Sequence, residues 1–204
     1  MPEGGEVLAT RVAFLELKDE RRLVQEGYEL LDEKRVLLAT EIMRQLRRYN
    51  ALQDELARRG GEALAGLEGA VGMHGFDKLT VEPKLDLARA QLVVQEQAFL
   101  GLRLVEAKLD DRGAPAGPEA RPTTPEARTC AAAHRVLVAR YVELAACVTS
   151  LRRLIREYVR TERRARALEN VVLPEIDESL RFIEEQLDAV DQEEAVRVRN
   201  AARA

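Results

Sequence analysis

The chain has 204 residues with four Tyr, four Phe and no Trp, so any core must be built from aliphatic side chains. Charged residues make up 33% and hydrophobic residues 46%, a composition typical of long helices and too apolar for a disordered chain. The net charge of −4 excludes a strongly basic nucleic-acid-binding protein on global grounds.

The sequence contains no membrane or secretion signal. No stretch approaches the roughly 20 apolar residues of a membrane-spanning helix, and the first residues lack the pattern of a signal peptide. Cys130 and Cys147 fall in one predicted helix, where their Cα atoms would lie roughly 25 Å apart, too far for a disulfide. Free thiols are typical of a reducing compartment, so we expect a cytoplasmic protein.

Residues 6–59 predict an N-terminal coiled-coil helix. They contain no proline, and apolar side chains recur every seven residues over about six heptads, more than the three or four that justify this assignment. The two rows of the predicted seam are Leu17, Val24, Leu31, Leu38, Gln45 and Leu52, and Arg21, Tyr28, Arg35, Ile42, Tyr49 and Leu56. Gly60-Gly61 is expected to end or loosen this helix.

Residues 60–109 predict a glycine-rich segment followed by a β-hairpin. Six glycines lie between Gly60 and Gly75, and no Gly-Lys-Ser/Thr follows them, which excludes a phosphate-binding loop. The expected strands are Ala90–Gln97 and Phe99–Leu109. In the second strand, three leucines alternate with Gly101 and Arg103; they are Leu100, Leu102 and Leu104.

Residues 110–123 are rich in proline and glycine and predict a flexible surface loop. A second coiled-coil helix is predicted over residues 124–198. Its start has two alternative explanations: Thr123 and Glu126 have the spacing of a capping box, and Thr124 precedes Pro125, which suits the first helical position. Either arrangement begins a helix here.

The apolar row of the C-terminal helix advances by about 3.6 residues per step. It consists of Leu137, Tyr141, Leu144, Val148, Leu151, Ile155, Tyr158, Glu162, Ala165, Leu168, Val172, Ile176, Leu180, Ile183 and Leu187. Steps of three before Leu168 and of four after it mark a change of helical phase. Nearby Pro174 lacks the N–H that would bond to Asn170, so we expect a bend. Among the residues above, Leu31, Leu38, Leu144, Leu151, Pro174 and Ile183 are the predicted seam and bend positions.

These lengths predict an all-α dominated fold. The first helix alone would be roughly 80 Å long, whereas a compact globule of this size is about 45 Å across. The simplest arrangement is a long antiparallel two-helix coiled coil formed by the N- and C-terminal helices, with a small middle region that contains the hairpin.

Candidate catalytic residues are few. His74 and His134 lie in unrelated surroundings without metal-ligand spacing, and acidic pairs such as Glu184-Glu185 are expected on solvated helix faces. We therefore predict a protein that is not an enzyme and has no cofactor or metal. The range Arg152–Arg166 holds seven arginines and two glutamates, either as a solvated face or as a surface for a protein, a nucleic acid or an anionic lipid.

Three blocks of sequence resemble the D subunits of V-type/A-type ATPases. The C-terminal block comprises Ala167–Ile176, which includes Leu173-Pro174, and Ser179–Asp188, which includes Ile183-Glu184-Glu185. The N-terminal block runs from Leu17 to Leu38 and includes Leu30-Leu31 and Lys34-Arg35. The middle block is Phe99–Leu104, although the proline that normally follows is absent. The aromatic residues that usually lie near the C-terminus of the family's chains are also absent.

The resemblance implies the central stalk, or rotor shaft, of a rotary ATPase. Such a shaft transmits torque between ATP hydrolysis or synthesis in the catalytic head and ion translocation in the membrane rotor. The implied partners are the F subunit of the stalk, the alternating A and B subunits of the head, and a C/d-type socket subunit. Nucleic acid and direct membrane insertion are not implied, and the expected location is cytoplasmic, peripheral to the membrane.

We predict that Leu100, Leu102 and Leu104 contact the F subunit, and that Arg160, Arg163 and Arg164 face protein partners. Two other functional classes stay open. One is a freestanding coiled-coil adaptor or export chaperone, which would share the helices but not the family blocks. The other is a nucleic-acid or membrane-surface binder that uses Arg152–Arg166.

Overall fold

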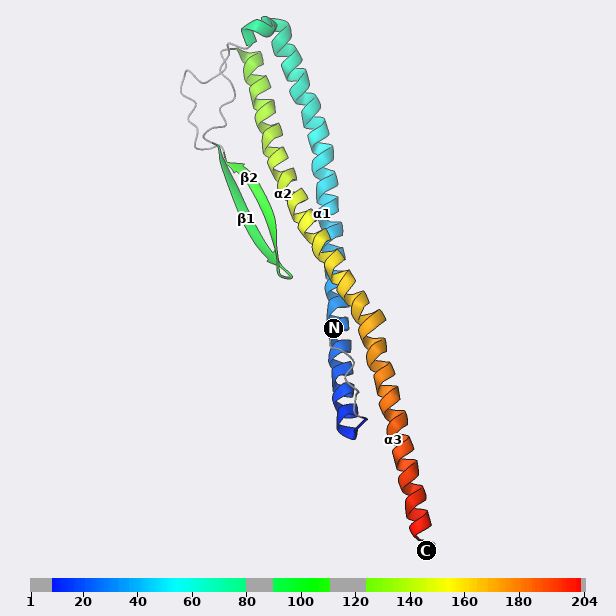
Figure 1. Cartoon of the computed structure of the whole chain (residues 1–204). Helices are drawn as coiled ribbons and strands as arrows, with labels where there is room; N and C mark the ends of the chain where they lie inside the picture. The colour runs from blue at the N-terminus through cyan, green and yellow to red at the C-terminus, as the bar shows by residue number, and fades with distance from the viewer. Residues whose placement is uncertain (1–8, 80–89, 111–123, 203–204) are drawn as a thin grey trace. The chain divides into compact units, whose positions relative to one another are not determined.

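The computed structural model describes residues 9–79, 90–110 and 124–202 (Figure 1). Its elements in chain order are α1 (Arg11–Leu79), β1 (Gln91–Phe99), β2 (Leu102–Asp110), α2 (Pro125–Ala167), the π-helical turn η2 (Leu168–Val172) and α3 (Leu173–Ala201). This order confirms the predicted fold class, with a long helix at each end and an antiparallel hairpin in the middle. None of the helices in the described ranges combines the length and apolar character needed to cross a membrane.

Contacts divide the chain into two compact units, and long helices run through both. The first unit combines residues 1–37 with residues 158–204, and the second comprises residues 38–157. Each unit therefore contains a stretch of α1 and a stretch of the C-terminal helices.

In the first unit, cross-helix pairs show that the two stretches run antiparallel. Arg11 pairs with Asp191 at 3.0 Å, and Arg35 pairs with Glu162 at 2.8 Å, so the partner numbers fall as the α1 numbers rise. The core of this unit includes Ile183, whose side chain is completely buried. Ion pairs thus line an aliphatic seam.

The second unit has the same antiparallel order. Glu55 of α1 pairs with Arg140 of α2 at 3.2 Å, and Gly66 lies against Cys130. A Cβ atom at Gly66 would stand 3.5 Å from the Cα atom of Cys130, so the two helix backbones approach closely there. Leu38 and Leu154 are fully buried in this unit.

The predicted end of the first helix at residue 59 is wrong, because α1 continues through Gly60-Gly61 to Leu79. The seven-residue repeat continues too, and Leu56, Ala63 and Ala70 are all buried. Burial of one helix face outweighs the low helix propensity of isolated glycines, which is about 1 kcal/mol each. The break in helical geometry lies later, at Gly75, where φ is 71°.

The start of α2 agrees with one of the two predicted alternatives. Thr124 caps the helix, since its Oγ1 accepts a hydrogen bond from the backbone N–H of Ala127 at 3.4 Å, and Pro125 is the first helical residue. Thr123 and the predicted loop after Asp110 lie outside the described residues, as does the predicted helix start at residue 6.

The predicted change of phase near Leu168 corresponds to η2. The N–H of Leu173 donates to the carbonyl of Leu168, five residues back rather than four. A π turn is wider than an α turn, which is why steps of four fit the buried face after Leu168. Pro174 is exposed near the start of α3, directly after this turn.

The predicted seam of α2 is wrong in part. Tyr141 and Ile155 are 54% and 45% exposed, and Leu144 and Leu151 are half-buried. Apart from Leu154, the buried positions of α2 hold small side chains: Ala127, Ala146, Cys147, Ser150, Thr161 and Ala165. Small residues let a neighbouring helix or strand pack closely against α2. A pattern based on large apolar side chains therefore selects positions that are not the most buried ones. On α1 the pattern is more accurate, with Leu38 buried and Leu31 half-buried.

Candidate functional site

The hairpin is the most distinctive surface of the second unit. Nine residue pairs join β1 and β2, from Gln91 with Asp110 to Phe99 with Leu102. The two turn residues, Leu100 and Gly101, have φ values of 47° and 83°. Positive φ at both positions is the mark of a type I′ turn, which matches the twist of the strands but is unfavourable for a leucine.

The hairpin is anchored by one edge. The backbone N–H of Val105 donates to Ser150 Oγ at 2.7 Å, and the same hydroxyl donates to the carbonyl of Val105 at 3.0 Å. Arg153 donates to the carbonyl of Arg103 at 2.5 Å. Ser150 is 1% exposed. Two side chains of α2 therefore satisfy backbone groups of β2 that a third strand would otherwise bind.

A further contact joins the hairpin to α1. Arg48 Nη1 donates to Glu106 Oε1 at 2.5 Å, and both side chains are more than two-fifths exposed. The hydrogen bond and the positive charge of Arg48 lower the pKa of the Glu106 carboxyl, while its partial burial opposes them. Because both side chains are solvent-accessible, the pair contributes little to stability.

Strand β1 is exposed along almost its whole length, from Gln91 to Ala98. Leu92, Val93 and Val94 are 58%, 41% and 50% exposed, so both faces of the strand present apolar side chains to solvent. Its one ionisable residue, Glu96, pairs with Arg103 of β2 at 3.3 Å. A surface strand with three exposed aliphatic side chains and one paired charge is a candidate binding surface.

The structure separates the three leucines that the sequence grouped together. Leu100 lies in the turn rather than in a strand and is 38% exposed, and Leu102 is half-buried. Leu104 is only 4% exposed and belongs to the protein's own core. The prediction that all three alternate along one strand is wrong, because the two-residue turn begins at Leu100.

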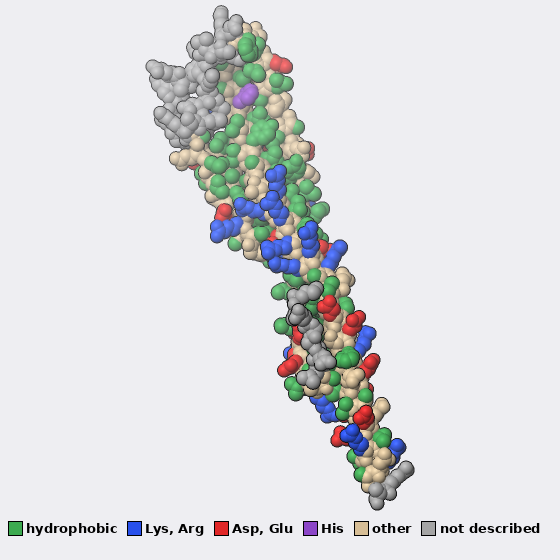
Figure 2. All heavy atoms as spheres, viewed as in Figure 1, with side chains coloured by type: hydrophobic (Ala, Val, Ile, Leu, Met, Phe, Trp, Pro, Cys, Tyr) green, Lys and Arg blue, Asp and Glu red, His purple; other side chains and the backbone are tan. Residues whose placement is uncertain are grey.

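Arg160, Arg163 and Arg164 are all exposed on α2. Within the described part of the chain, their guanidinium groups make no ion pair or hydrogen bond. Arg166 differs, since it donates to Glu162 at 2.8 Å. On the face seen in Figure 2, many of the Lys and Arg side chains gather in one region.

A polar cluster lies inside the helix pair of the second unit. Gln45, at a seam position, donates to Glu41 at 2.9 Å, and the Sγ atom of Cys147 lies 3.6 Å from the carbonyl of Gln45. Burial raises the pKa of Glu41, but hydrogen bonds from Arg44 and Gln45 outweigh it and the net pKa is lowered. Burial raises the pKa of the Cys147 thiol.

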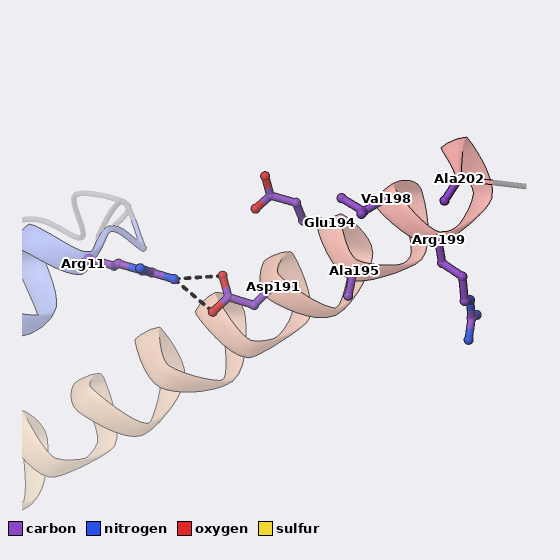
Figure 3. A pocket seen from close by; sticks show the side chains of 7 residues that line it. All are labelled: Arg11, Asp191, Glu194, Ala195, Val198, Arg199 and Ala202. Atoms are coloured by element: carbon purple, nitrogen blue, oxygen red, sulfur yellow. Dashed lines mark hydrogen bonds and ion pairs between the residues drawn. The ribbon is translucent and has the colours of Figure 1, made fainter.

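The last turns of α3 form an open, shallow depression (Figure 3). Arg11 forms hydrogen bonds with both carboxylate oxygens of Asp191, and the depression is lined further by Glu194, Ala195, Val198, Arg199 and Ala202. Every described residue from Asp188 onward is exposed. Such an open surface suits contact with another protein rather than enclosure of a small molecule.

The histidines occupy separate local settings. His74 Nε2 lies 3.8 Å from Glu126 Oε2, and His134 Nδ1 lies 2.9 Å from the carbonyl of Cys130. In the described ranges, no three His, Cys, Asp or Glu side chains are grouped so that they would hold a metal ion.

Sequence reasoning missed the residues that anchor the hairpin: Ser150, Arg153, Arg48 and Glu106. Ser150 had a usable signal, because it lies three residues after Cys147 and four before Leu154 and so shares their buried face. A buried hydroxyl needs a partner from outside its own helix or from the preceding turn. The arginines and the glutamate had no comparable signal among many exposed charges.

A family model for the ATP synthase D subunit matches residues 13–203 of the chain. The D subunit of the A-type ATP synthase of Pyrococcus horikoshii is 28% identical over 98% of this chain and 94% of that protein. The corresponding A-type protein of Methanoregula boonei is 29% identical over 95% of this chain and 94% of that protein. The D subunit of the V-type ATP synthase of Deinococcus radiodurans is 29% identical over 93% of this chain and 84% of that protein.

Proposed function

Because the chain belongs to the family of ATP synthase D subunits, we propose that it is the central-stalk rotor shaft of an A/V-type rotary ATPase. In this role it transmits torque between the catalytic head and the membrane rotor. It is a non-catalytic subunit that works at the cytoplasmic side, peripheral to the membrane. The observation that carries the proposal is the antiparallel pairing of long helices within each unit, together with the family match over most of the chain.

The contacts within each unit suit the transmission of torque. Two helices that are joined at several levels resist twisting against each other better than one helix alone. In the first unit, the Arg21–Asp177 pair at 2.6 Å and the Arg35–Glu162 pair at 2.8 Å flank buried aliphatic layers. Exposed ion pairs add little stability each, so the aliphatic layers hold the helices together and the ion pairs favour one register.

We assign partners to the exposed surfaces. The F subunit of the stalk contacts the hairpin through Leu100 and Leu102, whereas the buried Leu104 supports the hairpin from inside. Three arginines without an ion pair in the described ranges face acidic surfaces of the alternating A and B subunits; they are Arg160, Arg163 and Arg164. A C/d-type socket subunit joins the shaft to the membrane ring.

The test is reconstitution of the complex with and without this chain. The A, B and F subunits are co-expressed with the full-length chain and purified through a tag on the A subunit. We expect the chain and the F subunit to co-purify with the head, and ATP-driven rotation of a bead attached to the chain. A freestanding adaptor or chaperone would not co-purify in fixed stoichiometry. A head that retains the F subunit equally well without the chain would contradict the proposal.

Pro174 provides a finer test of the mechanism. It follows η2 directly, and its lack of an N–H keeps the regular α-helical hydrogen-bond pattern from closing there. We propose that this irregularity makes the shaft eccentric, so that it acts unequally on the surrounding catalytic interfaces. Pro174→Ala is expected to lower the coupling of ATP hydrolysis to ion transport in the reconstituted complex. Unchanged hydrolysis and coupling would contradict this part of the proposal.

A further inference from the structure

The two long edges of the hairpin differ in how their outward backbone groups are hydrogen-bonded. Along β2, Ser150 and Arg153 of α2 bind the outward backbone groups of Val105 and Arg103. Along β1, the described residues provide no partner for the outward backbone groups. Among the described residues, the same hairpin therefore has one satisfied edge and one open edge.

The register identifies which groups of β1 point outward. Both backbone groups of Val105 bind Ser150, so Val105 does not exchange hydrogen bonds with Glu96, its partner in β1. Hydrogen-bonded and non-hydrogen-bonded pairs alternate in an antiparallel ladder. The outward N–H and C=O groups of β1 therefore belong to Leu92, Val94, Glu96 and Ala98.

Strand β1 also lacks the features by which proteins protect an open edge. The strand, Gln91–Phe99, contains no proline and no lysine. Its pairing with β2 is one-to-one along the whole strand, without a bulge. Its single carboxylate, Glu96, is neutralised by Arg103 across the hairpin. A long edge with exposed Leu and Val side chains and a single, paired charge is a template for another strand.

We propose that the open edge of β1 binds an extended segment of another subunit of the rotary ATPase, which adds a third strand to the hairpin. This proposal rests on the proposed function for the identity of the partner as a subunit of that complex. The segment pairs its backbone with residues 92, 94, 96 and 98 and places uncharged, β-branched or aliphatic side chains beside Leu92 and Val94. Its backbone groups, rather than charges, supply most of the recognition.

Charge complementarity limits the occupant. Because Glu96 pairs with Arg103, the nine residues of β1 offer no free charge to attract a strongly charged peptide. The side chains of Leu92 and Val94, at least half exposed, lie on the same face of the strand and favour an apolar neighbour. The partner segment is therefore a nearly neutral strand of about seven residues, which matches the span from Leu92 to Ala98 along the open edge.

Residue-resolved hydrogen exchange of the full-length chain tests the proposal directly. In the free chain, the amides of Leu92, Val94, Glu96 and Ala98 should exchange close to their intrinsic rates, and those of Val93, Gln95 and Gln97 should be protected. In the reconstituted complex with the A, B, F and C/d-type subunits, the four outward amides should slow by at least tenfold. If they stay fast in the assembled complex, the edge proposal is wrong while the proposed function stands.

A matched pair of variants tests the same edge by affinity. Val94→Pro removes an outward N–H without removing a bond to β2, and Val94→Thr keeps the N–H with a side chain of similar shape. We expect Val94→Pro to bind the remaining subunits at least tenfold more weakly than Val94→Thr. Equal binding by the two folded variants contradicts the proposal, and the exchange pattern of the wild-type chain decides the question if Val94→Pro does not fold.

Two further outcomes would also overturn it. If the free chain protects the four amides and sediments as a dimer, the occupant of the edge is a second copy of this chain. If the chain does not assemble with the ATPase subunits at all, both the edge proposal and the proposed function fail. Sedimentation of the free chain and co-purification with the A subunit separate these two results.

Discussion

Arg35 Nη1 donates a hydrogen bond to Glu162 Oε2 at 2.8 Å, across the seam of the first unit. Arg35 lies in the predicted seven-residue row of α1, and Glu162 lies in the predicted 3.6-residue row of the C-terminal helix. An apolar residue is the usual choice at such positions. Arg166 donates to the other oxygen of the same carboxylate at 2.8 Å. One carboxylate therefore links α1 to two turns of α2.

Glu162→Gln should destabilise the protein at neutral pH and not in acid. The hydrogen bond from Arg35 lowers the pKa of Glu162 below its ordinary value near 4.5, burial opposes this, and Arg166 lowers it further. A lowered pKa in the folded state contributes stability above the unfolded-state pKa, and this contribution is lost as the pH falls through the folded-state value. The measurement is the free energy of urea unfolding from pH 7 to pH 3.

The control for this prediction is Glu184→Gln, at an exposed position of α3 without an ion pair within the described residues. It should match the wild type at every pH. The Glu162→Gln deficit should be largest at pH 7 and should shrink below pH 4.5. A deficit that stays constant across the range would show that Glu162 acts through packing rather than through its charge.

Ser150→Ala should detach the hairpin from α2. The substitution leaves both the N–H and the carbonyl of Val105 without their partner, and an unsatisfied buried polar group costs about 1–3 kcal/mol. Thr149→Ala is the matched control on the adjacent residue, since Thr149 is exposed and its one side-chain hydrogen bond to the described residues goes to the preceding turn of its own helix. Urea unfolding and amide exchange of Val105 measure the effect, and equal behaviour of the two variants would contradict it.

Gly61→Ala should stabilise the protein by about 1 kcal/mol, because α1 continues through this position and alanine has the higher helix propensity. Apart from the backbone of its own helix, no described part of the chain would lie within 4 Å of a methyl group at Gly61. By contrast, Gly66→Leu should destabilise by about 1–3 kcal/mol, because Gly66 faces the backbone of Cys130. Thermal unfolding followed by circular dichroism measures both, and a loss of helix on Gly61→Ala would show that α1 ends before this residue.

Leu100→Asn should strengthen the hairpin and weaken partner binding. Asparagine tolerates positive φ better than leucine, and the cost of the left-handed conformation for leucine is about 1–2 kcal/mol. The exposed Leu100 side chain is also our proposed contact for the F subunit. We expect slower amide exchange in β1 and β2 together with weaker binding of the F subunit by calorimetry, and unchanged binding would remove Leu100 from that contact.

The heptad of α1 was predictable because its buried positions hold large aliphatic residues such as Leu38 and Leu52. The continuation of α1 beyond Gly60-Gly61 was not predictable, because the same rows carry Ala63, Gly66 and Ala70 there. Glycines are weak helix formers in isolation, and alanines do not stand out as members of an apolar row. In the folded chain they occupy the seam, where Gly66 allows the close approach of α2.

The hairpin was predicted from its alternating pattern, but its attachment was not. Alternation identifies strands and says nothing about which edge another element covers. The contact between Ser150 and Val105 joins residues 45 positions apart, and only the three-dimensional structure shows that a helix side chain takes the place of a strand. The exposed faces of β1 also contradict the usual rule that one face of a hairpin is buried.

The π turn has a consequence for the length of the C-terminal helices. An extra residue in an α-helix rotates everything beyond it by about 100°, which would move the buried row to solvent. The wide turn at Leu168–Val172 takes up one residue locally, so that Thr161 before it and Ile176 after it are both buried. Related chains can therefore differ by a single insertion or deletion at η2 and keep the layers on both sides packed.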